Sequence, residues 1–178
     1  MTDEQLFDIL HPIILSVTSV PECILADPNA PSPSGSYAAV RPQQGIDERG
    51  QANVKRIAQP GALQKTEVRA QIVATCWVNF YRDNALLYAQ RLKQANKRPD
   101  VSMTLLKNRL GWGGTDAINN LTMLQSEKFE ERAQIAIRLL YETTDEATIN
   151  SIERVQIGVQ YEDGTTVETI DIETPDAP

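Results

Sequence analysis

The sequence is poor in the residues that carry most catalytic and metal-binding chemistry. Its 178 residues include one histidine, His11, and two cysteines, Cys23 and Cys76. Three such side chains cannot complete a four-ligand zinc site without carboxylates, and their spacing suggests none. A Cys–His nucleophile pair would need His11 beside one of the cysteines, but Cys76 falls on the apolar side of an expected strand, where a thiol is inert. We therefore expect no catalytic residue, no metal site and no cofactor.

Long apolar runs and a basic start to the chain are also missing. No run approaches the roughly 20 apolar residues of a membrane span. The segment 1–4 is acidic, whereas a signal peptide begins with basic residues. We expect a protein made inside a cell and not held in a membrane, with both cysteines as free buried thiols.

A phosphate-binding loop is the third missing feature. The stretch 111–116 (GWGGTD) is rich in glycine but lacks the Gly-Lys-Ser/Thr of such a loop. We interpret it as a flexible turn around one large aromatic residue, Trp112. Because tryptophan is enriched at the energetic centres of protein interfaces, Trp112 could instead fill a pocket on a partner.

What remains is the composition of one globular domain covering residues 1–178, with 41% hydrophobic and 23% charged residues. Apolar spacing and turn signals define an order of elements along the chain. The expected order is a helix at 3–19, a strand at 37–41, a polar arm at 42–64, a strand at 68–80, a helix capped by Asn84 and ended before Pro99, a helix from Asp100 to Leu110 with Gly111 after it, a strand at 129–141, a terminal hairpin, and a tail at 175–178. This order predicts an α+β fold, with a mainly antiparallel β-sheet and helices packed on one side.

The first helix and the polar arm each have a local signature. Thr2 and Gln5 form a predicted capping box, and Pro12 should kink the helix or end its first part. The arm 42–64 holds three glycines and few large apolar residues, so it cannot bury much. We expect it to project as a long loop or open hairpin that a neighbour could hold.

The terminal hairpin has a register that can be read from the sequence. Asp163-Gly164 is a preferred two-residue turn. Pairing Glu162 with Thr165 around it places Val159 opposite Glu168, Ile157 opposite Ile170 and Val155 opposite Ile172. The last two pairs are apolar on both strands, so turn chemistry and side-chain pairing agree.

Charge is segregated along the chain. The net charge of −7 argues against ordinary DNA binding. Residues 142–178 hold ten acids and one base, 82–109 hold seven bases and two acids, and 41–69 hold six bases and three acids. Copies could therefore bind head to tail, basic side to acidic side, although solvated faces without a partner would show the same pattern. The candidate interface residues are Arg49, Lys55 and Arg56 in the arm, Trp112, and Glu162 and Asp163 at the hairpin turn.

Three stretches give the sequence a resemblance to known proteins. They are the opening amphipathic helix from Glu4, the passage from 120–124 into 129–135, and the terminal hairpin. In these the chain resembles the tail terminator and neck terminator proteins of tailed bacteriophages. The resemblance implies a structural virion protein without catalytic residues, found in the tail or neck. It implies a homo-oligomeric ring, commonly of six subunits, that caps the tail tube, joins it to head-proximal neck or adaptor proteins and lets DNA pass through its channel.

Two other interpretations stay open at the level of sequence. One is a different phage assembly protein, such as a head–tail adaptor or a baseplate component. The other is a small-ligand binding module or an enzyme without a recognisable motif. A deep pocket lined by convergent polar groups would favour the latter.

Overall fold

The computed structural model describes residues 1–26, 31–59, 63–125, 128–150, 154–160, 164 and 166–173. The chain forms two compact units. The first consists of Met1–Gln51 and Ala70–Thr143, and the second of Ala52–Arg69 and Thr144–Pro178. Two long strands, β4 (Leu63–Tyr81) and β9 (Arg132–Asn150), supply residues to both units.

The first unit is built on a sheet with the strand order β1-β2-β4-β9-β5. Strands β2 (Tyr37–Glu48) and β5 (Gly111–Thr115) run antiparallel to β4 and β9 respectively, and the two residues of β6 (Asn119–Asn120) also pair with β9. Strand β1 (Glu22–Leu25), which the sequence reading missed, lies parallel to β2. The sheet is thus mainly antiparallel, and the predicted α+β class is confirmed.

Helix α1 (Asp3–Thr18) begins where the sequence predicts. The backbone N–H of Gln5 donates to Thr2 Oγ1 at 3.2 Å, and the N–H of Thr2 donates to Gln5 Oε1 at 2.9 Å, which completes the capping box. The helix continues past Pro12 as one element, so the proline does not end it. It stops at Ser19, whose φ of 62° is left-handed.

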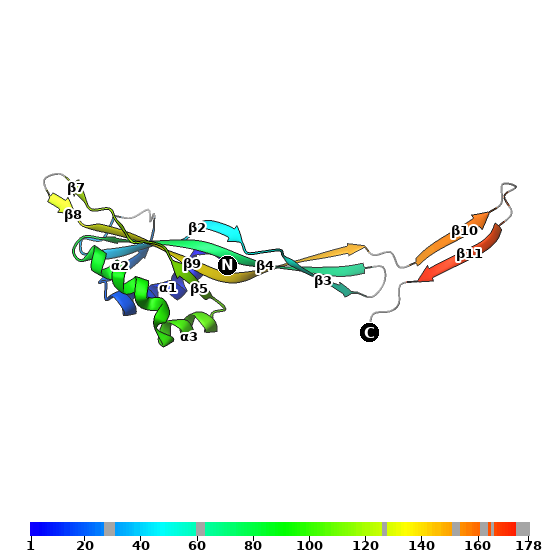
Figure 1. The fold of residues 1–178 in the computed structure, drawn as a ribbon, viewed down its shortest axis with the longest axis horizontal. Coiled ribbons are helices and arrows are strands. Elements are labelled where there is room, and N and C mark those ends of the chain that lie inside the picture. Colours follow the sequence, from blue (N-terminus) through cyan, green and yellow to red (C-terminus); the bar gives the residue numbers. More distant parts are fainter. Residues whose placement is uncertain are drawn as a thin grey trace. The chain divides into compact units, whose positions relative to one another are not determined.

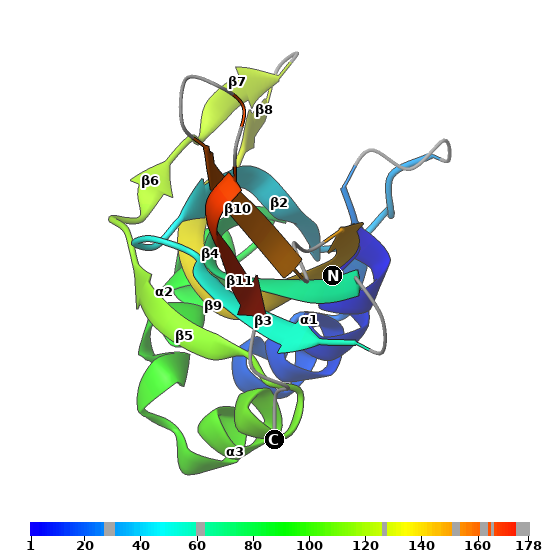
Figure 2. The ribbon, with the colours of Figure 1, turned by 90° about the vertical axis from the view of Figure 1, so that its right-hand side faces the viewer.

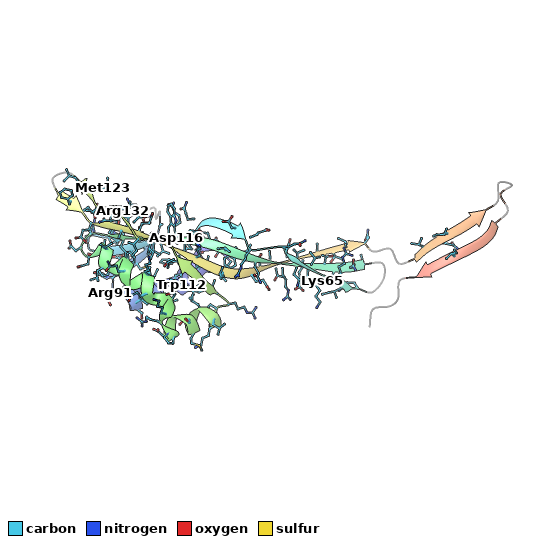
Figure 3. The ribbon with its side chains drawn as sticks, in the orientation of Figure 1. Lys65, Arg91, Trp112, Asp116, Met123 and Arg132 are labelled. Carbon is cyan, nitrogen blue, oxygen red and sulfur yellow. The ribbon has the colours of Figure 1, made fainter. Side chains whose placement is uncertain are left out.

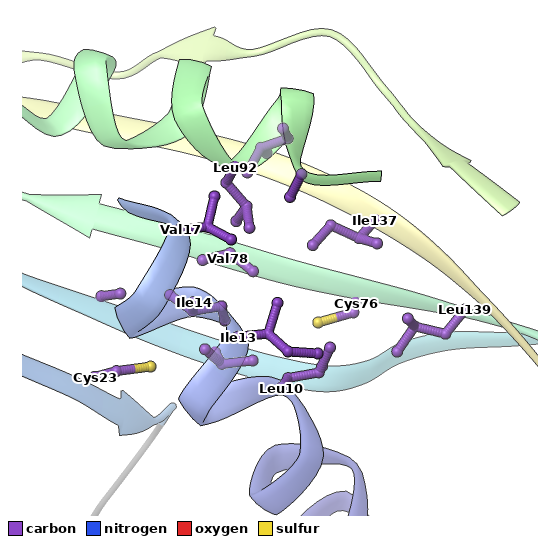
Figure 4. Close-up of a cluster of buried hydrophobic side chains, with 14 of the residues drawn as sticks. Leu10, Ile13, Ile14, Val17, Cys23, Cys76, Val78, Leu92, Ile137 and Leu139 are labelled. Atoms are coloured by element: carbon purple, nitrogen blue, oxygen red, sulfur yellow. The ribbon is translucent and has the colours of Figure 1, made fainter. Parts of the chain in front are cut away.

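The hydrophobic core lies between α1 and one face of the sheet. Alternate residues of β4 and β9 face it, as their period-two pattern predicts. Helices α2 (Ala85–Gln94) and α3 (Pro99–Lys107) cover the same side of the sheet, and a 3₁₀ turn, Ala95–Lys97, joins them (Figures 1 and 2). Figure 4 shows side chains of this core. It includes Leu10, Ile13, Ile14 and Val17 of α1, Cys76 and Val78 of β4, Leu92 of α2, and Ile137 and Leu139 of β9.

The caps of the second and third helices differ from the prediction. Asn84 precedes α2 but has a left-handed φ of 65°, and its side chain makes no capping hydrogen bond. Pro99, not Asp100, opens α3, because the fixed φ of proline suits the first helical position, where no N–H is needed. Helix α3 ends at Lys107, earlier than predicted, and Arg109 takes a left-handed φ of 56°.

The predicted glycine-rich turn at 111–114 is wrong, because these residues form the edge strand β5. A Cβ on Gly111 would meet Leu140 Cβ at 3.2 Å, and one on Gly113 would meet Leu140 Cγ at 3.2 Å and Arg138 Cβ at 3.3 Å. The missing side chains let β5 approach β9 closely. Gly111 and Gly113 therefore serve close strand packing, whereas Gly114 has a positive φ of 113° at a shift in the register of β5.

Two further strands form a separate small hairpin in the first unit. They are β7 (Met123–Gln125) and β8 (Lys128–Glu130), with Leu124 opposite Phe129. The sequence predicted a single strand from Phe129 to Tyr141. The structure divides it at Glu131, so β9 begins only at Arg132.

The second unit contains most of the predicted arm. Strand β3 (Asn53–Ala58) pairs antiparallel with the Gln64–Arg69 part of β4, while residues 42–48 extend β2 in the first unit. The described residues of 42–64 are thus mainly sheet, since backbone hydrogen bonds can be satisfied by neighbouring strands without large apolar side chains. Lys65 Nζ lies 2.7 Å from Glu146 Oε2, which links β4 to the last part of β9.

The terminal hairpin consists of β10 (Arg154–Gln160) and β11 (Thr166–Glu173). Val155 pairs with Ile172, Ile157 with Ile170 and Val159 with Glu168, so the predicted register is confirmed there. The register shifts by one residue after Val159. Of the predicted turn only Gly164 is described, with a positive φ of 85°. Glu162, Asp163 and the tail 175–178 lie outside the described residues.

Candidate interaction surfaces

In the part of the chain that the structure describes, the two cysteines and the single histidine do not form a catalytic site. Burial raises the pKa of the Cys23 thiol to about 12 and raises the pKa of Cys76 as well. Both thiols are therefore protonated at neutral pH. His11 lies on α1, with its ring 5.3 Å from that of Phe7. The described residues contain no group of three or more histidines, cysteines or acids arranged to hold a metal ion.

The predicted interface residues fall in both units. Arg49 is exposed after the end of β2 in the first unit, and its backbone N–H donates to the carbonyl of Gln71 at 2.8 Å. Lys55 and Arg56 are exposed on β3 in the second unit. The sequence grouped these three residues in one arm, whereas the structure places them in two separate compact units.

Trp112 lies on β5 and packs partly buried against the core of the first unit (Figure 3). Its Nε1 is buried and has no hydrogen-bond partner among the described residues. A buried indole N–H without an acceptor is uncommon, because an indole usually finds one. The structure gives this side chain a packing role, and a contact with a partner remains a prediction.

A pocket lies on the face of the sheet opposite the helices. Trp77, Asn79 and Tyr81 reach this face because they alternate along β4 with the core residues. Tyr37 on β2 is directly opposite Tyr81, and the two rings stack at 4.6 Å with an interplanar angle of 9°. We call the site lined by Tyr37, Trp77, Tyr81, Arg41 and Arg132 the Tyr–Arg pocket. Its volume is about 310 Å³.

Three polar contacts shape the Tyr–Arg pocket. The guanidinium of Arg132 lies over the Tyr81 ring, 4.9 Å from its centroid, and that of Arg82 lies 5.6 Å from the centroid of Tyr37. Gln134 Nε2 donates to Asn79 Oδ1 at 3.0 Å across β9 and β4. Burial raises the pKa of Tyr37, and the neighbouring Tyr81 adds to this effect. Aromatic faces and cations thus converge on one concave surface.

A second, more open cavity of about 620 Å³ adjoins the pocket and shares Tyr37 and Tyr81 with it. It is lined by acids, among them Glu130 and Glu131, and by Phe129. Arg82 Nε lies 3.7 Å from Glu130 Oε1. The two adjoining cavities therefore differ in charge, one basic and one mainly acidic.

Exposed apolar side chains gather on the β7–β8 hairpin. Phe129 is 75% exposed, and Met123 and Leu124 are each 58% exposed. Figure 3 labels Met123 on this hairpin. On α3, Met103 and Leu106 are also exposed, within the basic segment 82–109. Exposed large apolar side chains that form a patch are typical of contact sites for other macromolecules, and Leu124 and Phe129 are paired on one face of this hairpin.

Among the side chains of the second unit that the structure describes, no hydrophobic one is buried. Its apolar residues Val54, Leu63 and Ile149 are exposed, and so are Val155 and Ile157 of the terminal hairpin. Strands without a buried apolar face are marginally stable alone. The described surfaces thus suit contact with other proteins better than chemistry on a small substrate.

Comparison with protein families gives these surfaces a context. The family model described as phage neck terminator protein matches residues 4–165. The chain belongs to this family. The match includes the whole first unit from Glu4 onward and ends before β11. No curated protein matches the chain.

Phage neck terminator proteins are structural, so this chain is a structural protein of the phage tail and neck. As a component of that part of the virion, it interacts with other proteins of the tail and head. The suspected resemblance to the neck terminator group is thereby confirmed. None of the described helices is long and apolar enough to span a membrane.

The sequence pattern did not predict the Tyr–Arg pocket. Tyr37 and Tyr81 are far apart in the chain, and only the β2–β4 register brings their rings together. One signal was available, because Trp77 and Tyr81 place two large aromatics on the side of β4 that the alternation assigns to polar residues. Aromatic residues on an otherwise polar strand face are typical of a recognition surface.

Proposed function

We propose that the chain assembles into a ring, of six copies, that closes the end of the tail tube and joins it to the head. Family membership carries the proposal, and the segregation of charge supports it. A head-to-tail ring needs two different complementary surfaces on every subunit. The basic segment 82–109 in the first unit and the acidic segment 142–178 supply charges of opposite sign.

The exposed apolar residues of the second unit give a second line of support. Their burial between copies would contribute about 25 cal/mol for each Å² of apolar surface removed from water. Charge would then select the partner and orientation, while apolar contact would hold the ring together. The proposal requires no catalytic group.

Mass photometry and native mass spectrometry of the full chain test the ring. The expected species has a mass near six times the 19.8 kDa of one chain, in equilibrium with the monomer. Raising the salt concentration should shift the equilibrium toward the monomer, because exposed charges are screened beyond about 8 Å at physiological ionic strength. A chain that stays monomeric at high micromolar concentration, and does not bind purified tail tubes, would contradict the proposal.

Hydrogen exchange adds a test that is local to one unit. Amides of 53–58 and 154–160 should exchange quickly in the monomer and more slowly in the assembled protein, since the second unit lacks a buried apolar core among its described residues. Amides of 72–80 in the core of the first unit should be protected in both states and serve as the control. Equal exchange of the second unit in both states would argue against its burial between copies.

We also propose that DNA passes through the channel of this ring without being held. A net charge of −7 disfavours stable contact with phosphates, so the wall of the channel would repel the duplex and let it slide. The assembled protein should leave the gel mobility of double-stranded DNA unchanged at physiological salt. A shift that weakens steeply as salt is raised would indicate a basic channel instead.

A further inference from the structure

The Tyr–Arg pocket is a concave site, and none of its described lining residues belongs to a helix. At about 310 Å³ it can admit one side chain or a short length of extended chain. Its lining, within the described residues, includes two arginines, Arg41 and Arg132, and no carboxylate. A basic pocket with aromatic walls selects for an anionic group, because the low-dielectric walls strengthen the attraction.

Arg132 is the side chain in the pocket that most needs a partner. Its guanidinium is fixed over the Tyr81 ring, while its Nε is buried and has no hydrogen-bond acceptor within the described part of the chain. A buried donor without an acceptor destabilises the state that contains it. The buried Nε is closed to a ligand from outside, but Arg132 lines the pocket, so a carboxylate entering it would meet the guanidinium charge there.

The surroundings favour Arg132 over its neighbour Arg82 as the anchor for an incoming acid. Arg82 already lies 3.7 Å from Glu130 Oε1, and the cavity on that side is lined by acids. A carboxylate approaching through the acidic cavity would meet like charge. It is therefore directed to the Tyr–Arg pocket, which Arg41 and Arg132 line.

The chain itself holds a source of suitable acids. Residues 142–178 contain ten acids and one base. Within this segment, Val155, Ile157 and Ile170 of the β10–β11 hairpin are between 40% and 46% exposed. An isolated two-stranded hairpin is marginally stable in water and gains stability when its apolar residues are covered. This segment thus combines exposed apolar side chains with a negative charge, and its charge is opposite to that of the Tyr–Arg pocket.

From this complementarity we infer that the Tyr–Arg pocket binds a carboxylate side chain from the acidic segment 142–178 of a second copy, with Arg132 as the anchor. The inference rests on the proposed self-assembly and deepens it, because it names the contact between neighbours. Pocket and acidic segment are different surfaces of one chain, so the contact is head to tail and can continue around a closed ring.

Zero-length cross-linking on the full chain tests this contact. A carbodiimide joins an amine to a carboxylate only when the two touch. The variant Arg132→Lys supplies an amine at the pocket and keeps a cation near Tyr81. Equal amounts of ¹⁴N- and ¹⁵N-labelled protein are mixed and cross-linked, and linked peptides are identified by mass spectrometry. Links that combine the two isotopes come from different copies.

The variant Arg138→Lys is the matched control. Arg138 lies on the same strand and carries an exposed guanidinium, whose Nη2 is 2.5 Å from Asp116 Oδ1, and it does not line the pocket. Its amine should link to Asp116 within one copy. This verifies that the reagent detects a known contact.

The expected result is a mixed-isotope link from position 132 to an acid within 142–178. In parallel, Arg132→Gln should raise the concentration needed for assembly about ten-fold or more, while Arg138→Gln should leave it unchanged. A link from position 132 to any other segment, or unchanged assembly of Arg132→Gln, overturns this inference but does not contradict the proposed ring. A wild-type chain that never assembles overturns both.

Discussion

Replacing Gly113 by alanine tests the close packing of strand β5 on β9. The new Cβ would lie 3.2 Å from Leu140 Cγ and 3.3 Å from both Arg138 Cβ and the Arg138 carbonyl oxygen. Two of these three contacts involve atoms attached to or within the backbone of β9, so they cannot be relieved by rotating a flexible side chain. Gly113→Ala should therefore force the two strands apart.

The magnitude follows from two opposing effects. Overpacking a close contact costs about 1–3 kcal/mol, whereas Gly→Ala stabilises by about 0.4–1 kcal/mol through the lower entropy of the unfolded chain. We expect a net loss of about 1–2 kcal/mol in the free energy of unfolding. In a chain of this size that lowers Tm by about 2–8 °C.

Urea denaturation of the monomer provides the assay, with Trp112 as a fluorescent reporter beside the substitution. Gly45→Ala is the matched control in strand β2, because its Cβ would meet only Thr75 Cβ, at an ordinary 4.0 Å. That variant should equal or slightly exceed the wild type in stability. If Gly113→Ala were as stable as Gly45→Ala, the close β5–β9 pairing would be refuted and a loose turn at 111–114 would be the better description.

Four further predictions concern the first helix and the thiols. The Thr18 side chain is fully buried, and its hydroxyl donates to the Ile14 carbonyl at 2.7 Å and accepts from the backbone N–H of Val20 at 3.1 Å. Thr18→Val should therefore lower the free energy of unfolding by about 1–3 kcal/mol, measured by urea denaturation. Thr18→Ser keeps the hydroxyl and should lower it less. Pro12 is exposed inside a continuous helix, so Pro12→Ala should raise the unfolding free energy by about 1–3 kcal/mol, and a loss would show that the ring packs favourably. Cys23 and Cys76 have raised pKa values, so a thiol reagent at pH 8 should label neither until denaturant is added. Because the pKa of each buried thiol lies above that of a free thiol, near 8.5, the thiols favour the folded state below that pH. Their contribution to the free energy of unfolding should be lost as pH rises toward 12. A free energy of unfolding that stays constant over this range would contradict their burial.

The parts of the fold that could be predicted are those with a strong local pattern. The alternation on β4, the apolar spacing of α1 and the pairing of Ile157 with Ile170 each depend on neighbours in sequence or on one turn. In each case the residues that bury apolar surface also have the local preference for that element. For these elements the local conformational preference and the long-range burial of apolar side chains favour the same structure, so they can be predicted from sequence.

The parts that could not be predicted depend on contacts distant in sequence. Strand β1 exists because β2 offers it a parallel edge, and β5 exists because β9 lies beside its glycines. The Tyr–Arg pocket has the same origin, since Tyr37 and Tyr81 meet through strand register and Arg132 joins them from a third strand. No short stretch of sequence contains the signal for these features.

The two units differ in a way that bears on how the protein works. Every hydrophobic residue that the structure describes as buried belongs to the first unit, whereas the apolar residues of the second unit whose side chains are described are exposed or only half-buried. The first unit can therefore hold its fold by its own core. The second unit, rich in acids and poor in buried apolar surface, gains most from contact with another protein. In the proposed ring, the first unit would keep its fold by its own core, while contact between copies would add stability mainly to the second unit. Assembly would then be coupled to the stability of the part that makes the contact, which favours a closed ring over partial associations.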